Sequence, residues 1–408
     1  MPSVSREKLI QYRNGAKSEL YEDILPFWMR HALDNTHGGF YGAMANDLTV
    51  DPESPKSAVL CTRILWTYSA AYRITGDGQY LSMCQRAMGE IENRFWDKTN
   101  GGLYWWLDFR GNPLETDKKM YAQAFAIYAL AEHYRSVHTS KSLDLARRLY
   151  ETIEEKGRDL DLPGYFDFFN ADWSPKGNAT LSDDTDLPAE KTMNTHLHIL
   201  EGYAGLYRIW MDDVLAGRLR SLIDIHLDRI LDPETGHLRL FFDRGWKSIS
   251  EAVSYGHDIE ASWLLCEAAH ILGDKARMDR TEQAALHIAK GVMLEAQDKD
   301  GGIFNEGGPG GAVVDTDKHW WPQAEAAVGF LNAYHLSGDA AFLDASMKSW
   351  GFIQEKLVDR KYGEWFWKTD RNGTPDNTQP KVSPWKCPYH NGRACMEIME
   401  RLDAILKK

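Results

Sequence analysis

The stretch DKTNGGLYWW at residues 97–106 combines an aspartate, a polar turn, two glycines and a run of aromatic residues. This composition predicts a tight β-turn that leads into a short strand. Similar units begin at aspartates that lie 63, 64, 71, 66 and 61 residues apart along the chain. A chance motif would not keep this spacing, so we predict six repeats of about 65 residues. The other units are DNTHGGFY (34–41), DLPGYF (161–166), DPETGHL (232–238), DKDGGIF (298–304) and DRKYGEWF (359–366).

Each repeat leaves room for two helices beside its turn. One set of segments is rich in Ala, Leu, Ile and aromatic residues on more than one face, which is typical of helices covered on both sides. A second set, such as Gln79–Phe95 and Ala340–Leu357, carries charge on one side and is expected to lie outside. The sequence therefore predicts an all-α fold, an (α/α)6 barrel of six helical hairpins with short β-hairpin loops at one mouth. The predicted inner helices are Ser57–Ile74, Met120–Tyr134, Thr192–Trp210, His257–Leu272, Trp320–Leu336 and Tyr389–Leu406.

The ends of three inner helices share a pattern. Gly76, Gly273 and Gly338 each follow a helical segment, and each is followed by an aspartate. Glycine adopts the left-handed conformation that closes a helix, and aspartate caps the start of the next one. These turns connect inner to outer helices, so the repeat units should lie at the other end, beside the N-termini of the inner helices.

Composition excludes several classes of protein. We expect residues 1–408 to form one barrel domain, because no linker interrupts the repeats. The net charge of -13 argues against nucleic-acid binding, which needs a basic face. The 5 cysteines form no CxxC pair, so we expect neither disulfides nor a zinc cluster. We therefore expect the protein to be cytoplasmic. No signal peptide or membrane-spanning stretch is evident. For the oligomeric state, we expect a monomer or a weak homodimer.

Residues capable of chemistry recur early in the predicted inner helices. A site at the mouth of the barrel would draw its side chains from this part of each repeat, since the N-terminal ends of these helices meet there. No two-residue motif supports this interpretation alone, but the recurrence does. The residues are Arg63, Tyr121, Asn194 with His198, His257 with Glu260, Trp321 with Glu325, and His390 with Arg393.

Four stretches resemble the N-acylglucosamine 2-epimerase superfamily, and within it most closely the cellobiose 2-epimerase branch. They are KTMNTHLHILE (191–201), YGHDIEASWL (255–264), HWWPQAE (319–325) and WKCPYHNGR (385–393). The resemblance covers nearly the whole chain in order and spacing. It implies an (α/α)6 barrel that inverts C2 of a sugar, a β-1,4-linked disaccharide such as cellobiose or lactose, without a cofactor or a metal ion.

The resemblance also implies roles for individual residues. His257 and His390 match the two acid/base groups, because inversion needs one group on each face of a planar enediolate and histidine titrates near neutrality. His198 would help open the ring, Glu260 would hold the imidazole of His257 one turn away, and Arg63 would stabilise the enediolate charge. The predicted substrate-binding residues are Tyr121, Asn194, Asp186, Trp263, Trp321, Glu325 and Trp385.

Several alternatives stay open from the sequence. Monosaccharide enzymes of the superfamily, namely N-acylglucosamine 2-epimerase, mannose isomerase and mannose 2-epimerase, share the fold. An (α/α)6 glycoside hydrolase would need two carboxylates that flank a glycosidic bond, for which Asp186, Glu260 and Glu325 are candidates. A non-catalytic interaction protein is the third alternative, although the retained histidines argue against it. Metal catalysis is not expected, because the sequence has no HExxH motif.

Overall fold

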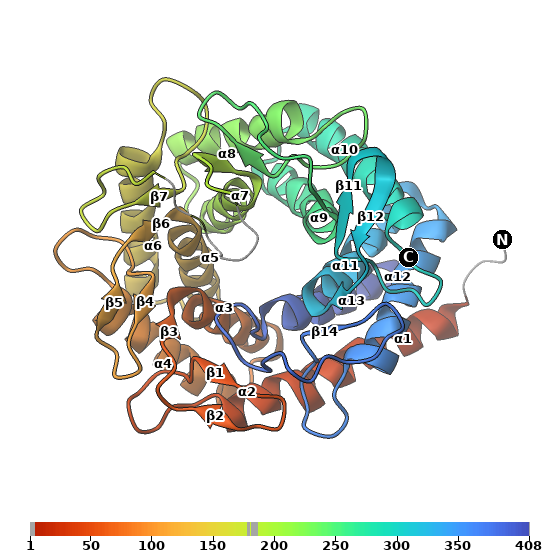
Figure 1. The fold of residues 1–408 in the computed structure, drawn as a ribbon, viewed down its shortest axis with the longest axis horizontal. Coiled ribbons are helices and arrows are strands. Elements are labelled where there is room, and N and C mark those ends of the chain that lie inside the picture. The colour runs from red at the N-terminus through yellow and green to blue at the C-terminus, as the bar shows by residue number, and fades with distance from the viewer. Residues whose placement is uncertain (1–4, 178–179, 181–186, 408) are drawn as a thin grey trace.

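The computed structural model describes residues 5–177, 180 and 187–407. In this part of the chain the helices form two concentric rings around one axis (Figure 1). The predicted (α/α)6 barrel is confirmed. The inner ring contains α3 (Ala58–Thr75), α5 (Met120–Val137), α7 (Met193–Tyr207), α9 (Tyr255–Leu272), α11 (Trp320–Ser337) and α13 (Tyr389–Lys407). The outer ring contains α1 (Arg6–Ser18) with α2 (Leu25–His31), α4 (Leu81–Glu90), α6 (Ser140–Thr152), α8 (Asp213–Ile225), α10 (Lys275–Glu295) and α12 (Ala340–Phe352).

The predicted turns between inner and outer helices are confirmed by their backbone. Gly76, Gly273 and Gly338 have φ values of 69°, 70° and 71°, which an L residue with a Cβ rarely adopts. Each glycine is the C-cap of its helix in the left-handed conformation, and its backbone N–H donates to a carbonyl of the last turn. The aspartate after each glycine then caps the next helix, as when the side chain of Asp274 accepts a hydrogen bond from Arg277 N.

The outer helices end differently. Most of them continue into a π-helical turn, which the sequence did not predict, and α10 instead runs to Glu295 as α-helix among the described residues. A π turn widens the helix by one residue and redirects the chain toward the repeat unit. These turns are Glu19–Ile24, Ile91–Phe95, Ile153–Gly157, His226–Ile230 and Ile353–Leu357.

The repeat unit itself is a turn fastened by a buried ion pair. In the second repeat, Asp97 N donates to Gly102 O at 2.8 Å, and the carboxylate of Asp97 binds Nζ of buried Lys118 at 2.8 Å. Lys118 lies two residues before α5, so the pair ties the turn to the start of the next inner helix. The same pairing occurs as Lys56–Asp34, Lys191–Asp159, Lys318–Asp298 and Lys381–Asp359.

The third repeat starts two residues earlier than the sequence analysis placed it. Asp159, not Asp161, donates its backbone N–H to Gly164 O at 3.0 Å and pairs with Lys191 at 3.0 Å. The unit is therefore the eight-residue stretch DLDLPGYF at 159–166, as long as DKTNGGLY at 97–104. The prediction was wrong because two nearby aspartates both precede the glycine, and only the buried lysine distinguishes them.

Short antiparallel strands link each repeat to the next. The strand before an inner helix pairs with a strand from the following hairpin, and a bridge between Met44 and Val382 joins the first repeat to the last. The ring is therefore closed. The strands are β1 (Ala43–Met44) with β2 (Val50–Asp51); β3 (Lys56–Ser57) with β4 (Trp106–Leu107) and β5 (Pro113–Glu115); β6 (Lys118–Lys119) with β7 (Phe168–Phe169); β8 (Lys191–Thr192) with β9 (Phe241–Phe242); β10 (Val253–Ser254) with β11 (Glu306–Gly308) and β12 (Ala312–Asp315); and β13 (Lys318–His319) with β14 (Lys368–Thr369).

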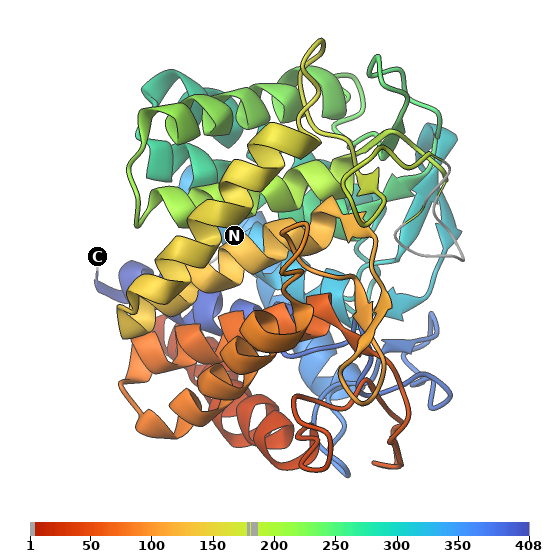
Figure 2. The ribbon, with the colours of Figure 1, turned by 90° about the vertical axis from the view of Figure 1, so that its left-hand side faces the viewer.

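The strands and long loops gather at one end of the barrel (Figure 2). Because α3, α5, α7, α9 and α11 each begin directly after one of these strands, their N-termini open at this end. The mouth predicted from the repeats is therefore the end that the strands surround. In the described part of the chain, no helix combines the length and the apolar character needed to cross a membrane.

Candidate active site

A cavity of about 370 Å³ opens at this mouth. Aromatic and aliphatic side chains of the loops form much of its rim, including Phe168, Leu240, Phe241 and Trp367. Most residues predicted for the site line the cavity, whereas Trp263 and Glu325 are absent from the lining that the described residues form. Asp186 lies outside the described residues. The predicted residues that line the cavity are Arg63, Tyr121, Asn194, His198, His257, Glu260, Trp321, Trp385 and His390.

The site residues of the inner helices form two levels, because residues three or four apart lie on one helix face. The upper level, at the second or third residue of each helix, faces the open cavity. The deeper level comes about one turn later and lies nearer the middle of the barrel. The upper level contains Tyr121, Asn194, His257, Trp321 and His390. The deeper level contains Arg63, His198, Glu260, Glu325 and Arg393.

His257 and His390 approach the cavity from α9 and α13. Both imidazoles contact the ring of Trp321, with centroid distances of 4.7 Å and 5.6 Å. Gly256 permits this packing, since a Cβ there would lie 2.4 Å from an atom of the Trp321 ring. Burial lowers the pKa of each histidine to about 3, so that both imidazoles are neutral at pH 7 and able to accept a proton.

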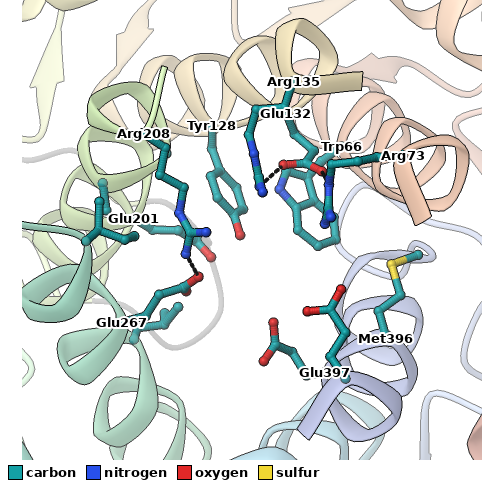
Figure 3. A pocket seen from close by; sticks show the side chains of 15 residues that line it. Trp66, Arg73, Tyr128, Glu132, Arg135, Glu201, Arg208, Glu267, Met396 and Glu397 are labelled. Carbon is teal, nitrogen blue, oxygen red and sulfur yellow. Dashed lines mark hydrogen bonds and ion pairs between the residues drawn. The ribbon is translucent and has the colours of Figure 1, made fainter. Parts of the chain in front are cut away.

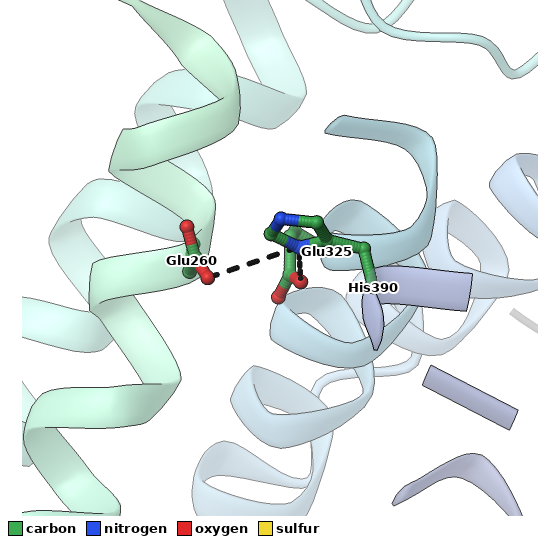
Figure 4. Close-up of side chains that lie close together, drawn as sticks. All are labelled: Glu260, Glu325 and His390. Carbon is green, nitrogen blue, oxygen red and sulfur yellow. Dashed lines mark hydrogen bonds and ion pairs between the residues drawn. The ribbon is translucent and has the colours of Figure 1, made fainter. Parts of the chain in front are cut away.

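The two histidines have different supports. His390 Nδ1 lies 2.7 Å from Glu325 Oε1 and 3.9 Å from Glu260 Oε1 (Figure 4). His257 Nδ1 lies 2.7 Å from the hydroxyl of Ser254, the residue at the end of β10. One imidazole is therefore supported by a carboxylate and the other by a neutral hydroxyl.

This arrangement corrects the predicted role of Glu260. We expected its carboxylate to hold His257, one turn before it on the same helix. Instead, Glu260 Oε1 accepts a hydrogen bond from Arg393 Nη2 at 2.7 Å, and burial together with the charge of Glu325 raises the pKa of Glu260. The two side chains share a helix face, but that of His257 turns to Ser254 at the start of α9 while Glu260 meets α13 across the axis.

Arg393 connects the deeper level. Its guanidinium binds Glu260 and Glu325, each at 2.7 Å, and also Glu201 of α7. Glu260, Glu325 and His390 could together present three metal ligands, with ligand atoms within 4.8 Å of one another. The guanidinium of Arg393 already binds both carboxylates, however, so this cluster is a buried ion-pair network.

Trp263 belongs to this network and not to the cavity wall. Its indole Nε1 donates to Glu325 Oε2 at 3.0 Å, and its ring packs against the guanidinium of Arg393 at 4.7 Å. Trp263 is therefore placed to position Glu325, which in turn holds His390. The sequence analysis assigned Trp263 and Glu325 to substrate contact, whereas the structure places both behind the cavity wall.

Arg63 and His198 complete the deeper level. Arg63 Nη2 donates to the hydroxyl of Tyr121 at 2.7 Å, and its guanidinium lies 4.4 Å from the ring centre of Phe125. Among the described residues it forms no ion pair with a carboxylate, so its charge is available to the cavity. His198 Nδ1 lies 3.0 Å from Glu201 Oε2, which fixes this imidazole as well.

The sequence analysis missed Ser254, Glu201 and Tyr389. Glu201 follows His198 by three residues, the same spacing as His390 and Arg393, and this spacing was the available signal. The hydroxyl of Tyr389 donates to Glu201 Oε1 at 2.5 Å. Ser254 gave no signal, because a serine before a helix is usually its cap.

A second polar cavity, of about 200 Å³, lies at the other end of the inner helices (Figure 3). Five of its charged residues pair with one another: Glu132 binds Arg73 and Arg135, each at 2.6 Å, and Arg208 binds Glu267. We call it the rear cavity. Its paired charges leave less capacity for acid/base chemistry than the histidines at the mouth.

Known proteins of similar sequence and fold show the family of this chain. The model of the N-acylglucosamine 2-epimerase family matches residues 39–394. Cellobiose 2-epimerase of Bacteroides fragilis is 43% identical, with 94% of this chain and 97% of the relative covered. Cellobiose 2-epimerase of Dictyoglomus turgidum is 40% identical, with 95% and 98% covered. The structure of cellobiose 2-epimerase from Bacillus thermoamylovorans superposes with a TM-score of 0.91 at 39% identity, over 96% of this chain and 99% of that one.

Proposed function

Since the chain belongs to the N-acylglucosamine 2-epimerase family and is a carbohydrate epimerase of the isomerase class, we propose that it inverts C2 of the reducing-end glucose of β-1,4-linked disaccharides. Cellobiose and lactose are the proposed substrates. The observation that supports this most is the pair of imidazoles, from His257 and His390, that line the cavity and both contact the ring of Trp321. Each is anchored through Nδ1, which leaves Nε2 for the cavity.

The reaction begins with ring opening. His198, held by Glu201, serves the proton transfer between O1 and O5 that gives the open-chain aldehyde. One of the two neutral imidazoles then takes the proton from C2, which is acidic because it lies beside the aldehyde carbon. The product is a planar enediolate whose negative charge Arg63 stabilises.

Inversion follows from reprotonation on the other face. The second histidine delivers a proton to C2 from the opposite side, and the ring closes as the epimer that carries mannose at its reducing end. The imidazolium formed in the first step is stabilised by Glu325 when His390 is the base. Delivery of a proton to C1 instead of C2 would give a ketose, so we expect a minor aldose–ketose isomerisation.

The choice of a disaccharide rests on two supports. The relatives with about 40% identity are named for cellobiose. The lining of the cavity also includes Trp385, Phe168, Phe241 and Trp367, which offer flat apolar faces for a second sugar ring. A monosaccharide epimerase or isomerase of the same family is the alternative.

One experiment separates these substrates. The purified protein would be incubated with cellobiose, lactose, mannose and N-acetylglucosamine, and the products resolved by chromatography, with and without a chelator. We expect the epimers of cellobiose and lactose, formed at the same rate in both cases. A product set containing only N-acetylmannosamine would contradict the disaccharide, and activity lost to the chelator and restored by a divalent ion would contradict a metal-free reaction.

The same incubation tests the hydrolase alternative. A glycosidase needs two carboxylates that face the bond, and Glu260 and Glu325 both bind Arg393. We therefore expect no free monosaccharide from cellobiose. Its release would favour hydrolysis, and a protein with no effect on any of the sugars would favour the non-catalytic alternative.

A further inference from the structure

We propose that Ser254 is a positioning residue for His257 and not for His390. The two bases proposed for the two faces of C2 are then held by different residues. The inference rests on the proposed epimerase function and assigns a residue to it that the sequence analysis did not name. Ser254 lies at the N-terminus of α9, lines the cavity, and holds Nδ1 of His257 at 2.7 Å.

Comparison with equivalent positions shows that this hydroxyl has an unusual role. Ser57 and Thr192 precede α3 and α7, and each side chain accepts a hydrogen bond from a backbone N–H of its own helix. Ser254 occupies the same position before α9, yet its side chain caps no backbone N–H among the described residues of that helix. It gives up a cap that usually stabilises a helix and binds the imidazole instead.

The chemistry of a hydroxyl explains the use of this contact. A carboxylate can only accept a hydrogen bond, so Glu325 fixes His390 with the proton on Nδ1. A hydroxyl can donate or accept, so Ser254 holds the His257 ring in place with its proton on either nitrogen. His257 can therefore present either a bare or a protonated Nε2 to C2 without leaving its position.

Exchange of the C2 hydrogen in D2O, followed by NMR, tests the proposal one face at a time. In His390→Asn the remaining base is His257, and in His257→Asn it is His390. Ser254→Ala should slow exchange about tenfold in the His390→Asn background, the scale of one lost hydrogen bond. It should slow exchange much less in the His257→Asn background, where His257 is absent. Ser254→Thr, which keeps the hydroxyl, should restore the rate.

Two controls separate positioning from general damage. Ser57→Ala removes a true helix cap, and should lower the melting temperature without selective loss of exchange in either background. Ser254→Asp should move the acid limb of the exchange rate in the His390→Asn background to higher pH, because a carboxylate favours the imidazolium. A purely structural serine would produce no such shift.

The outcomes distinguish the proposal from the function on which it rests. Equal slowing by Ser254→Ala in both backgrounds, or failure of Ser254→Thr to restore exchange, would overturn the role of Ser254 alone. Absence of exchange by the unmodified protein with all tested sugars would overturn the epimerase function as well. If an Asn variant does not fold, Ser254→Ala in the unmodified protein should slow initial exchange from one epimer only, and equal slowing from both would again overturn the proposal.

Discussion

The two ends of the barrel axis hold polar cavities with opposite character. The rear cavity has the greater number of formal charges, yet its arginines and glutamates bind one another, as Arg73 and Arg135 bind Glu132. At the mouth, Asn194 Oδ1 and Arg63 Nε are buried without a hydrogen-bond partner among the described residues. An unmet polar atom inside a protein is costly unless a ligand meets it. Both residues line the cavity at the mouth, where a bound ligand could meet these atoms.

The largest loss of activity is expected from substitutions at the mouth. His257→Asn or His390→Asn should reduce epimerisation by about 10²- to 10⁴-fold, the usual contribution of one general acid or base. In D2O each variant should exchange the C2 hydrogen of one epimer only, because the remaining imidazole returns a solvent-derived proton to its own face. NMR of both epimers measures this.

His196 provides the control for those variants. It lies two residues before His198, but its Nδ1 contacts Thr192 O at 2.7 Å and its Nε2 accepts from Tyr165 N at 3.0 Å. Its replacement by Asn should lower stability and leave the exchange pattern two-sided. A His257 or His390 variant that still interconverts the epimers at a substantial rate would instead indicate a single base, with an intermediate that rotates between protonations.

Arg63→Lys should have the next largest effect. Lysine keeps the charge but lacks the planar fork that can bind two oxygens, so we expect a barrier higher by about 2 to 4 kcal/mol, as for loss of one oxyanion donor. The steady-state rate with cellobiose measures it. Arg208→Lys in the rear cavity is the matched change, and near-normal turnover of Arg63→Lys would show that diffuse positive potential suffices.

Acid should weaken the mouth through its buried neutral histidines. Burial lowers the pKa of His196, His257 and His390 to about 3, below the 6.5 of an exposed histidine. As the pH falls from 6.5 toward 3, the unfolded chain binds protons that the folded chain does not, so stability falls by up to about 1.4 kcal/mol per histidine per pH unit. Urea unfolding at pH 7 and pH 5 measures this, and His257→Asn should show a smaller loss. An equal loss in that variant would contradict a neutral His257.

The smallest effect is expected at the rear cavity. Arg208→Ala removes a partly exposed ion pair with Glu267, and should change the free energy of unfolding by about 1 kcal/mol or less. Its epimerisation rate should equal that of the unmodified protein. A loss of rate as large as that of Arg63→Lys would show that the rear cavity takes part in the reaction.

Much of the fold could be predicted because each repeat contains residues with strong preferences for a particular backbone conformation or for helix capping. Gly76, Gly273 and Gly338 end one helix by their backbone conformation, and the side chain of the aspartate that follows each glycine caps the next helix. The π turns of the outer helices have no comparable local signal. The third repeat was misplaced because Asp159 and Asp161 look equivalent in the sequence. In the structure, Asp159 is the one that binds Lys191.

The sequence predicted most of the side chains that line the cavity, but not which of them contact one another. Spacing within one helix fixes the face that a side chain occupies, and it brought His257 and Glu260 correctly to the interior. It does not determine which neighbour a side chain meets across the axis, where Glu260 binds Arg393 of α13. Trp263 was misassigned for the same reason, since its distance from the cavity depends on how α9 and α11 pack.

The position of Arg393 on the closing helix has a consequence for biosynthesis. Its partners Glu201, Glu260 and Glu325 lie on α7, α9 and α11, all of which leave the ribosome before α13. Until α13 docks, these three carboxylates lack the guanidinium that binds them, and a dry interior would hold unpaired negative charge. We therefore expect the nascent barrel to stay open and hydrated along its axis until α13 brings Arg393 and the proposed base His390 into place in the same step.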